Sequence, residues 1–295
     1  MILDARSLPR NSEVKADVCI VGAGAAGITL AREFLSQPFN VCLVESGGER
    51  FGSAIQALSQ GDTAGLDYYP LDECRQRVLG GTTHLWMGWC APFEEMDFEE
   101  RDWVPFSGWP FRRSSLVPFY ERAQSVCQVG PFVYEVEPWE NPGHPRLPVL
   151  EERITTKMFQ FSPPTRFGTV YRDELARAEN LETLVNGTAV ELETTESAGQ
   201  VTRVQVASSD GQRVAVTARL FILAAGGIET PQLLLLSNRV QKAGLGNQHD
   251  LVGRFFMEHP YHNTAVFLPN DRNLPLEMYF PHTGSHANGP VGMVG

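Results

Sequence analysis

The sequence predicts an α/β protein: a Rossmann-like domain that carries a β-meander insertion, accompanied by a second region. Three observations predict this fold class. A glycine motif separates an apolar strand from a helix within residues 17–35. Several short strand-like segments fill residues 181–218, and another apolar strand followed by a double glycine lies within 220–238. Strands that alternate with helices are typical of a parallel sheet with helices on its faces.

The first glycine motif lies between a strand expected at 17–21 and a helix expected at 28–35. Its three glycines form the pattern G-x-G-x-x-G. The first glycine allows a tight turn, the second lets a diphosphate approach the backbone, and the third permits close packing of helix on strand. The helix N-terminus then offers free N–H groups to phosphate oxygens. The cofactor residues expected here are Gly22, Gly24, Ala25 and Gly27.

A second strand is expected at 41–44 and ends at Glu45 and Ser46. An acidic side chain at the tip of this strand is suited to accept hydrogen bonds from a ribose diol. We therefore add Glu45 and Ser46 to the expected dinucleotide site. The motif alone does not distinguish NAD from FAD, so an NAD-dependent dehydrogenase is an alternative at this point.

The segment VLGGTTHLWMGWCAPF, residues 78–93, favours FAD. Together with Arg77 it resembles the glucose–methanol–choline family of FAD-dependent oxidoreductases, which carry a basic residue and a Gly-Gly-Ser/Thr segment after the first motif. The resemblance implies that LGGTT runs along the diphosphate and under the flavin ring. Glycine allows close backbone approach, and threonine can donate to phosphate oxygens. The residues assigned in this way are Arg77, Gly80, Gly81, Thr82 and Thr83.

The segment LFILAAGGIETPQLLLLSN, residues 220–238, is similar to a second signature of that family. The resemblance implies that its glycine turn, with Ala225 and Gly226, lies near the adenosine half of FAD. We expect Thr230 to cap the following helix and Pro231 to be its first residue. Taken alone, the segment is equally compatible with an ordinary strand–turn–helix unit of the core.

Residues 181–218 are expected to form the inserted meander, with Asp210-Gly211 as a hairpin turn. The resemblance implies that the backbone of Val190 lies against the adenine. The complete expectation is a Rossmann-like FAD-binding domain with a β-meander insertion, plus an incomplete substrate-side region. The FAD-binding domain is assigned to 14–90 and 180–258, and the lid and substrate-side region to 91–179 and 259–295.

His84 raises the question of covalent attachment, because some relatives link FAD to a histidine that directly precedes a tryptophan. Here Leu85 stands between His84 and Trp86. In an extended segment one residue reverses the direction of a side chain. We therefore expect noncovalent FAD with His84 as a polar residue of its wall, and a covalent link through His84 is the alternative. Trp86, Met87 and Trp89 either wall the flavin or pack in the core.

Three expectations concern the second region. A helix is expected at 114–126, capped by Ser114 or Ser115, and the proline-rich residues 130–150 are expected to form a lid or linker. The final residues, PHTGSHANGPVGMVG, are expected to form a glycine-rich loop rather than a strand or helix.

The resemblance implies an oxidoreductase that acts on the CH–OH group of an alcohol or sugar, passing hydride to flavin N5, with an unidentified electron acceptor. Members of the family are longer, so the catalytic histidine is expected beyond Gly295 and little turnover is expected from this chain alone. We assign His259, in FMEHP, to the fold rather than to catalysis. The alternative is a non-catalytic flavin-binding component or a defective fragment.

Composition excludes several other classes. The 295 residues carry a net charge of -11, which is unsuited to nucleic-acid binding. No apolar run approaches the roughly 18 residues of a membrane-spanning helix, and the N-terminus lacks the apolar stretch of a secretory signal. The five cysteines are scattered and contain no C-x-x-C, so neither a zinc site nor a disulfide framework is expected. These features predict a cytoplasmic protein without a bound metal.

Overall fold

The computed structural model describes residues 1–149, 154–258, 266–271, 273–286 and 289–294. The chain divides into two compact units, Met1–Leu85 with Arg166–Pro260 and Trp86–Thr165 with Tyr261–Gly295. The first unit is therefore built from two distant parts of the chain, and the second interrupts it. The domain limits drawn from the sequence remain a prediction.

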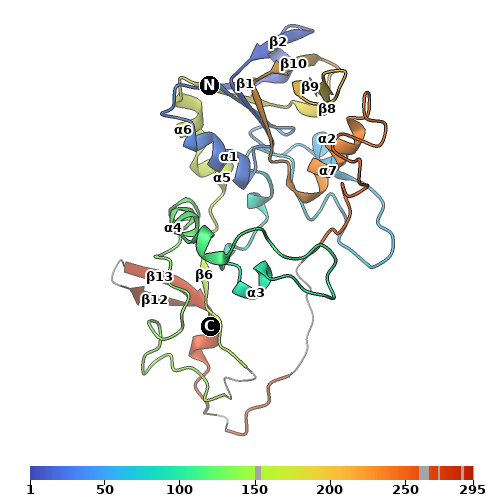
Figure 1. Cartoon of the computed structure of the whole chain (residues 1–295). Coiled ribbons are helices and arrows are strands. Elements are labelled where there is room, and N and C mark those ends of the chain that lie inside the picture. Colours follow the sequence, from blue (N-terminus) through green and yellow to red (C-terminus); the bar gives the residue numbers. More distant parts are fainter. Residues whose placement is uncertain (150–153, 259–265, 272, 287–288, 295) are drawn as a thin grey trace. The chain divides into compact units, whose positions relative to one another are not determined.

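A parallel five-stranded sheet forms the centre of the first unit (Figure 1). Its strands, in spatial order, are β1 (Ile2–Asp4), β7 (Leu181–Val185), β4 (Val41–Val44), β3 (Val18–Val21) and β11 (Leu220–Leu223). Strands β3 and β4 are buried at every position, as expected for central strands covered on both faces. The chain passes from β3 towards β4 and β7 on one side, and β11 lies on the other. The carboxyl ends of β3 and β11 therefore meet at a topological switch point, where ligands bind in such sheets.

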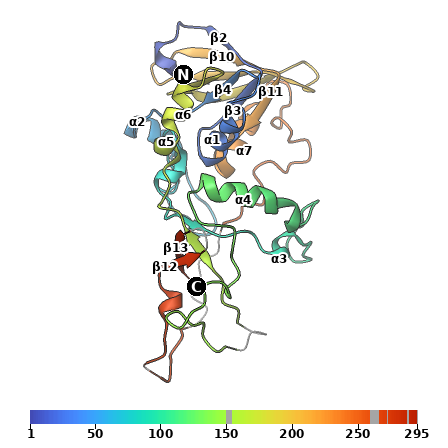
Figure 2. The same cartoon turned by 90° about the vertical axis from the view of Figure 1, so that its left-hand side faces the viewer.

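Helix α1 (Ala25–Glu33) follows β3 directly and buries Gly27, Ile28 and Ala31. The predicted helix, 28–35, was wrong at its start by three residues. The reason is that Gly24 already serves as the N-cap, so the motif itself supplies the first turn. Two short helices, α5 (Phe167–Val170) and α6 (Arg172–Arg177), lie beside α1 in both views (Figures 1 and 2).

A second sheet of four strands packs on one face of the parallel sheet. Its order is β2 (Ser12–Lys15), β10 (Arg213–Thr217), β9 (Val201–Ala207) and β8 (Thr188–Thr194). Valines of β9 and β10 share one core with alternate residues of the parallel sheet, including Cys19, Val21, Cys42 and Val44. Gly211, with φ +81°, makes the turn before β10.

The predicted meander is correct for its last three strands and wrong for its first. Residues 181–185 form β7, which pairs with β1 and β4 in the parallel sheet rather than with β8. Composition does not separate these two pairings, because both place the strand in apolar surroundings. The second sheet is instead completed by β2, which pairs in parallel with β10.

Helix α7 (Gly226–Leu236) follows β11, and its predicted start was also wrong. Ala225 rather than Thr230 is the N-cap, and Pro231 lies inside the helix. Gly226, with φ +86°, lets the chain turn straight from strand into helix. Pro231 is tolerated there although it cannot donate to the carbonyl of Gly227, one turn earlier.

The second unit contains an antiparallel sheet in the order β12 (His282–His286), β13 (Gly289–Val294), β6 (Phe159–Phe161) and β5 (Trp89–Cys90). The predicted glycine-rich loop at the end of the chain was therefore wrong. Backbone pairing with β6 provides a hydrogen-bonded ladder that does not depend on apolar side chains. That signal is absent from the local sequence.

Helix α4 (Val117–Val126) also lies in the second unit, and its predicted cap was wrong. A 3₁₀ turn, Arg113–Leu116, precedes it, so Leu116 is the N-cap and Pro118 lies in the first turn. The remaining short elements are α2 (Ser53–Gln56), α3 (Glu95–Phe98), and the 3₁₀ turns Ala5–Ser7, Ala57–Ser59, Gly81–His84 and Glu277–Tyr279. None of the helices in the described ranges is long and apolar enough to traverse a bilayer.

Candidate functional site

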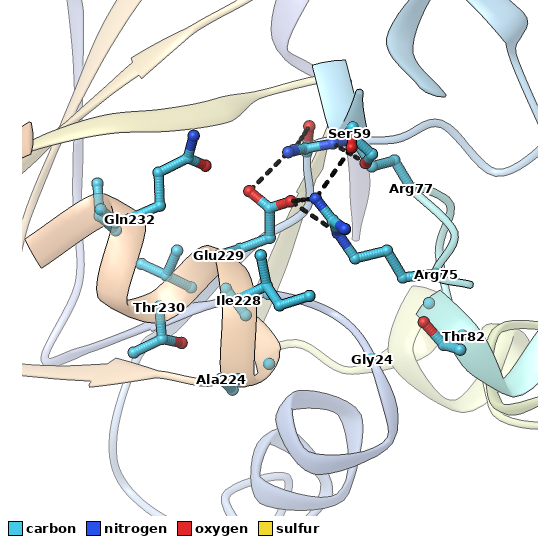
Figure 3. Close-up of a pocket in the computed structure, with 18 of the residues that line it drawn as sticks. Gly24, Ser59, Arg75, Arg77, Thr82, Ala224, Ile228, Glu229, Thr230 and Gln232 are labelled. Atoms are coloured by element: carbon cyan, nitrogen blue, oxygen red, sulfur yellow. Dashed lines mark hydrogen bonds and ion pairs between the residues drawn. The ribbon is translucent and has the colours of Figure 1, made fainter. Parts of the chain in front are cut away.

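A cavity of about 910 Å³ lies in the first unit at the carboxyl ends of β3, β4 and β11 (Figure 3). Its wall comes from the turn after β3, the tip of β4, residues 74–83, the start of β8 and the first turns of α7. This volume is at the upper end of the range for small-molecule sites. The cavity therefore coincides with the switch point of the parallel sheet.

The turn between β3 and α1 is shaped for close approach of a ligand. Gly22 has φ +102°, and its N–H donates to Val44 O at 2.8 Å. A Cβ on Gly24 would meet no atom within 4 Å, whereas one on Gly27 would lie 1.8 Å from Gly22 O. Helix α1 has no side-chain cap, so its first N–H groups are available to an anion. One glycine thus keeps the cavity open, and another lets α1 pack on the turn.

The second glycine segment lies against the first. Gly80 N donates to Ala23 O at 2.8 Å, and a Cβ on Gly81 would lie 3.0 Å from the Cα of Gly24. Gly80 and Gly81 both have positive φ, at +97° and +56°. The buried Thr83 hydroxyl donates to Gly80 O at 2.7 Å and holds the 3₁₀ turn in place. The two glycine segments together leave room for a diphosphate beside two stretches of bare backbone.

Glu45 is buried and joins two segments of the wall. Its Oε2 accepts from Ala23 N at 2.9 Å, and its Oε1 accepts from Gly47 N at 2.8 Å. Burial raises the pKa of Glu45 to about 7, although these two N–H groups and the charge of Arg77 lower it. Each oxygen retains a further lone pair that could accept from a ligand hydroxyl.

Val190 lies where the ladder of β8 is irregular. The pairing with β9 shifts register between Ala189 and Glu191, so Val190 has no assigned Cα partner there. Val190 lines the cavity. A bulge leaves a residue outside the regular ladder, and such bulges frequently lie beside functional sites.

An ion-pair cluster on the cavity wall was not predicted from the sequence. Glu229, in the first turns of α7, pairs with Arg75 at 2.9 Å and with Arg77 at 2.7 Å. Figure 3 shows the Glu229 side chain pointing from α7 towards both guanidinium groups. An acid near a helix N-terminus and two basic residues separated by one residue are each common in sequences, so only the fold shows that they meet.

Twelve of the fifteen cofactor residues predicted from the sequence line this cavity: Gly22, Gly24, Ala25, Glu45, Ser46, Arg77, Gly81, Thr82, Thr83, Val190, Ala225 and Gly226. The other three lie behind its wall. Gly27 packs α1 on the turn, and a Cβ on Gly80 would lie 2.4 Å from Gly168 N. A ring nitrogen of His84, Nε2, lies 2.9 Å from Leu79 O, so its imidazole is held by the preceding turn.

Two further expectations concern residues outside this cavity. Trp89 lies in the second unit, is 51% exposed and packs edge-on against Phe159 and Phe161. His259 falls outside the described residues. Within the part of the chain that the structure describes, no three His, Cys, Asp or Glu side chains gather as a metal site.

Comparison with known protein families identifies the cofactor. Residues 17–243 match the DAO family, described as FAD dependent oxidoreductase. The chain belongs to this family. The matched range contains both glycine segments and the whole of α7, and it therefore covers most of the cavity wall. The predicted resemblance to an FAD-dependent oxidoreductase family is thus confirmed, and FAD is the cofactor.

Curated relatives are distant and longer. The chain is 26% identical to the fructose dehydrogenase large subunit of Gluconobacter japonicus, over 85% of this chain and 59% of that one. It is also 26% identical to 6'''-hydroxyparomomycin C oxidase of Streptomyces lividus, over 81% of this chain and 53% of that one. The chain therefore spans about half the length of the curated relatives that it matches.

A solved structure shares the fold, and a second is more weakly similar. An FAD-dependent oxidoreductase from Chaetomium thermophilum is 18% identical, with a TM-score of 0.50, over 75% of this chain and 47% of that one. A formate oxidase is 18% identical, with a TM-score of 0.49, over 78% of this chain and 48% of that one. The Rossmann-like FAD-binding fold expected from the sequence is confirmed.

The residues present fit FAD. The cavity is large enough for a dinucleotide moiety, an uncapped helix N-terminus and an unobstructed Gly24 suit a diphosphate, and Glu45 suits a ribose. These features come from one unit of the chain, so the wall of the site is formed by residues that the structure places together.

Proposed function

We propose that the chain holds FAD noncovalently in this cavity, as part of a glucose–methanol–choline-type flavoenzyme that oxidises a CH–OH group. The uncapped N-terminus of α1 and the segment 81–83 would hold the diphosphate. Glu45 would accept from ribose hydroxyls, and the backbone of Val190 would lie against the adenine. The observation that carries the proposal is the meeting of both glycine segments at the switch point, where the Cα of Gly24 is open to the cavity.

A noncovalent flavin is supported by the position of His84. Its imidazole interacts with Leu79 O and does not line the cavity. For a covalent link it would have to break that contact and turn towards the ligand. If Trp86 is equivalent to the tryptophan of relatives with a covalent flavin, Leu85 occupies the linking position, and its side chain has no nucleophilic atom.

When bound, FAD supplies a hydride acceptor, N5, for the carbon of the alcohol being oxidised. The chain's own residues bind and orient that cofactor and exclude water from its diphosphate. No histidine is among the described residues that line the cavity. We therefore place the base that removes the hydroxyl proton outside this cavity, and we expect the chain alone to turn over at least ~100-fold more slowly than an enzyme that has the base.

An alcohol or sugar substrate is supported by the relatives. One is named for the dehydrogenation of fructose and another for the oxidation of 6'''-hydroxyparomomycin C, and both names denote hydroxyl-bearing compounds. We propose a carbohydrate hydroxyl as the substrate class and an external electron acceptor. The five free cysteines support a reducing, cytoplasmic location.

The cofactor part of the proposal is tested on the purified chain by its visible spectrum before and after denaturation. Near-stoichiometric FAD released into the supernatant is expected, and flavin that stays with the precipitate would contradict the noncovalent assignment. The substrate part is tested anaerobically on the protein purified from its native source. A panel of sugars and simple alcohols should bleach the flavin, and its failure to respond to any of them would refute oxidation of a CH–OH group.

A further inference from the structure

The cationic wall of the FAD cavity is already occupied by a carboxylate of the chain itself. Glu229 Oε1 pairs with Arg75 at 2.9 Å, and Glu229 Oε2 pairs with Arg77 at 2.7 Å. The three side chains are only 12–17% exposed. All three line the cavity, so Glu229 occupies the guanidinium groups that an anionic ligand in the cavity would bind (Figure 3).

The guanidinium group of Arg77 also donates hydrogen bonds to other acceptors of the wall. Arg77 donates from Nε to Ser59 Oγ at 2.8 Å and from Nη1 to Ser46 Oγ at 3.0 Å. Its Nη2 donates to Leu58 O and pairs with Glu229. These contacts account for four of the five N–H groups that an arginine carries. A phosphate that binds Arg77 through more than the one remaining N–H must therefore replace one of these partners, and the anionic one is Glu229.

The charges that line the cavity do not favour an anion. Among the described lining residues, two arginines face three carboxyl groups, those of Glu45, Glu229 and Glu258, and the raised pKa of Glu45, about 7, leaves it only partly charged at neutral pH. Glu45 accepts from backbone N–H groups, and Glu258 accepts from the Tyr68 hydroxyl at 2.6 Å. Glu229 is thus the carboxylate that neutralises the arginines directly.

We propose that Glu229 competes with the diphosphate of FAD for Arg75 and Arg77 and thereby sets the affinity of the cavity for that anion. In the unliganded chain the carboxylate holds the two guanidinium groups beside each other and compensates their mutual repulsion. The diphosphate then depends mainly on the backbone of the two glycine segments and the N-terminus of α1. This inference rests on the assignment of the cavity to FAD, and it is independent of which substrate the enzyme oxidises.

The test compares ADP, which carries the diphosphate, with adenosine, which lacks it, by calorimetric titration of the whole chain. In Glu229→Gln the amide oxygen can still accept from one arginine, but the amide N–H groups repel the other. We expect ADP to bind about tenfold more tightly, since a charge is removed at close range in a partly buried site, while adenosine affinity stays unchanged. The unliganded variant should also unfold at a lower temperature, because two adjacent cations lose their shared partner.

The matched control is Glu258→Gln, which removes a carboxylate from the same cavity but breaks no arginine contact that the structure shows. An equal rise in ADP affinity in this control would show that any carboxylate of the cavity weakens ADP binding through its charge. That result would overturn the proposal that Glu229 competes for the two arginines. Unchanged or weaker ADP binding in Glu229→Gln would overturn it as well. Equal changes for ADP and adenosine would indicate a structural role alone and also count against it.

If Glu229→Gln does not fold, the pair Arg75→Gln and Arg75→Gln/Glu229→Gln provides the same comparison with less repulsion. The double variant should bind ADP more tightly than the single one, because Arg77 is then released, and equal affinities would overturn the proposal. A wild-type chain that binds neither FAD nor ADP would overturn the cofactor assignment of the cavity and this inference together. Wild-type binding with no response in the variants would overturn only the inference.

Discussion

Two glycines of one motif, three residues apart, are expected to fail in opposite ways when each is replaced by alanine. At Gly27 a Cβ would lie 1.8 Å from the carbonyl oxygen of Gly22. At Gly24 a Cβ would meet nothing within 4 Å, and the backbone there, with φ -79°, is accessible to alanine. Gly27→Ala should therefore damage the fold, and Gly24→Ala should damage ligand binding alone.

The loss of stability expected for Gly27→Ala follows from the steric overlap between the new Cβ and the Gly22 carbonyl oxygen. The Gly22 carbonyl must retreat by about 1.2 Å to regain even the shortest normal contact, ~3.0 Å, while its own N–H is bonded to Val44 O. Overpacking of this kind costs about 3 kcal/mol. For a chain of this size the melting temperature should fall by about 6 to 12 °C.

Gly24→Ala should stay within about 1 kcal/mol of the wild-type stability. Alanine makes the unfolded chain less flexible, so less entropy is lost on folding, and this gain roughly offsets a poorer helix cap. Its methyl group enters the space assigned to the diphosphate, and about 2 kcal/mol of overpacking there weakens FAD binding about 30-fold. Thermal unfolding without FAD and fluorescence titration with FAD measure the two effects separately. Wild-type FAD affinity in Gly24→Ala, or equal melting temperatures for the two variants, would refute this reasoning.

Three further outcomes are expected. His84→Ala should retain FAD and lose only about 1 kcal/mol of stability, from the contact with Leu79 O, as measured by flavin content and thermal unfolding. Burial raises the pKa of Glu45 from 4.5 to about 7. Between these two pH values the folded chain therefore holds a proton that the unfolded chain releases. The stability that this proton confers is fully present below pH 4.5 and is lost as the pH rises to about 7. Glu45→Gln should flatten that slope in melting temperatures recorded across the interval, and an unchanged slope would assign it to another group. Gly168→Ala would place a Cβ 1.8 Å from Leu79 O, so it should destabilise the chain about as much as Gly27→Ala, and a wild-type melting temperature would contradict the packing.

The sequence predicted well those parts of the fold whose signals lie within a few neighbouring residues. Strands β3, β4 and β11 are runs of apolar residues, and the turn after β3 carries its glycines at fixed offsets. Such patterns reflect burial and backbone conformation within a few residues. Together with the family resemblance, they were sufficient to predict twelve of the residues that line the cavity.

The parts that failed depend on contacts between distant segments. Whether 181–185 joins the parallel sheet or the meander is decided by β1 and β4, which lie far away in the sequence. Strand β13, near the end of the chain, pairs with β6, which lies more than 120 positions earlier. Glu229 gains its importance from Arg75 and Arg77, about 150 positions earlier. Local periodicity carries no information on such pairings.

The split of the parallel sheet along the chain has a consequence during synthesis. Strand β3 (Val18–Val21) is buried throughout, yet its neighbour on one side, β11 (Leu220–Leu223), is made about 200 residues later. At typical ribosomal rates of about 5 to 20 residues per second, the central strand waits roughly 10 to 40 seconds with one edge unpaired. During that time the nascent chain presents an unpaired edge of an apolar strand, and such edges favour aggregation unless chaperones cover them.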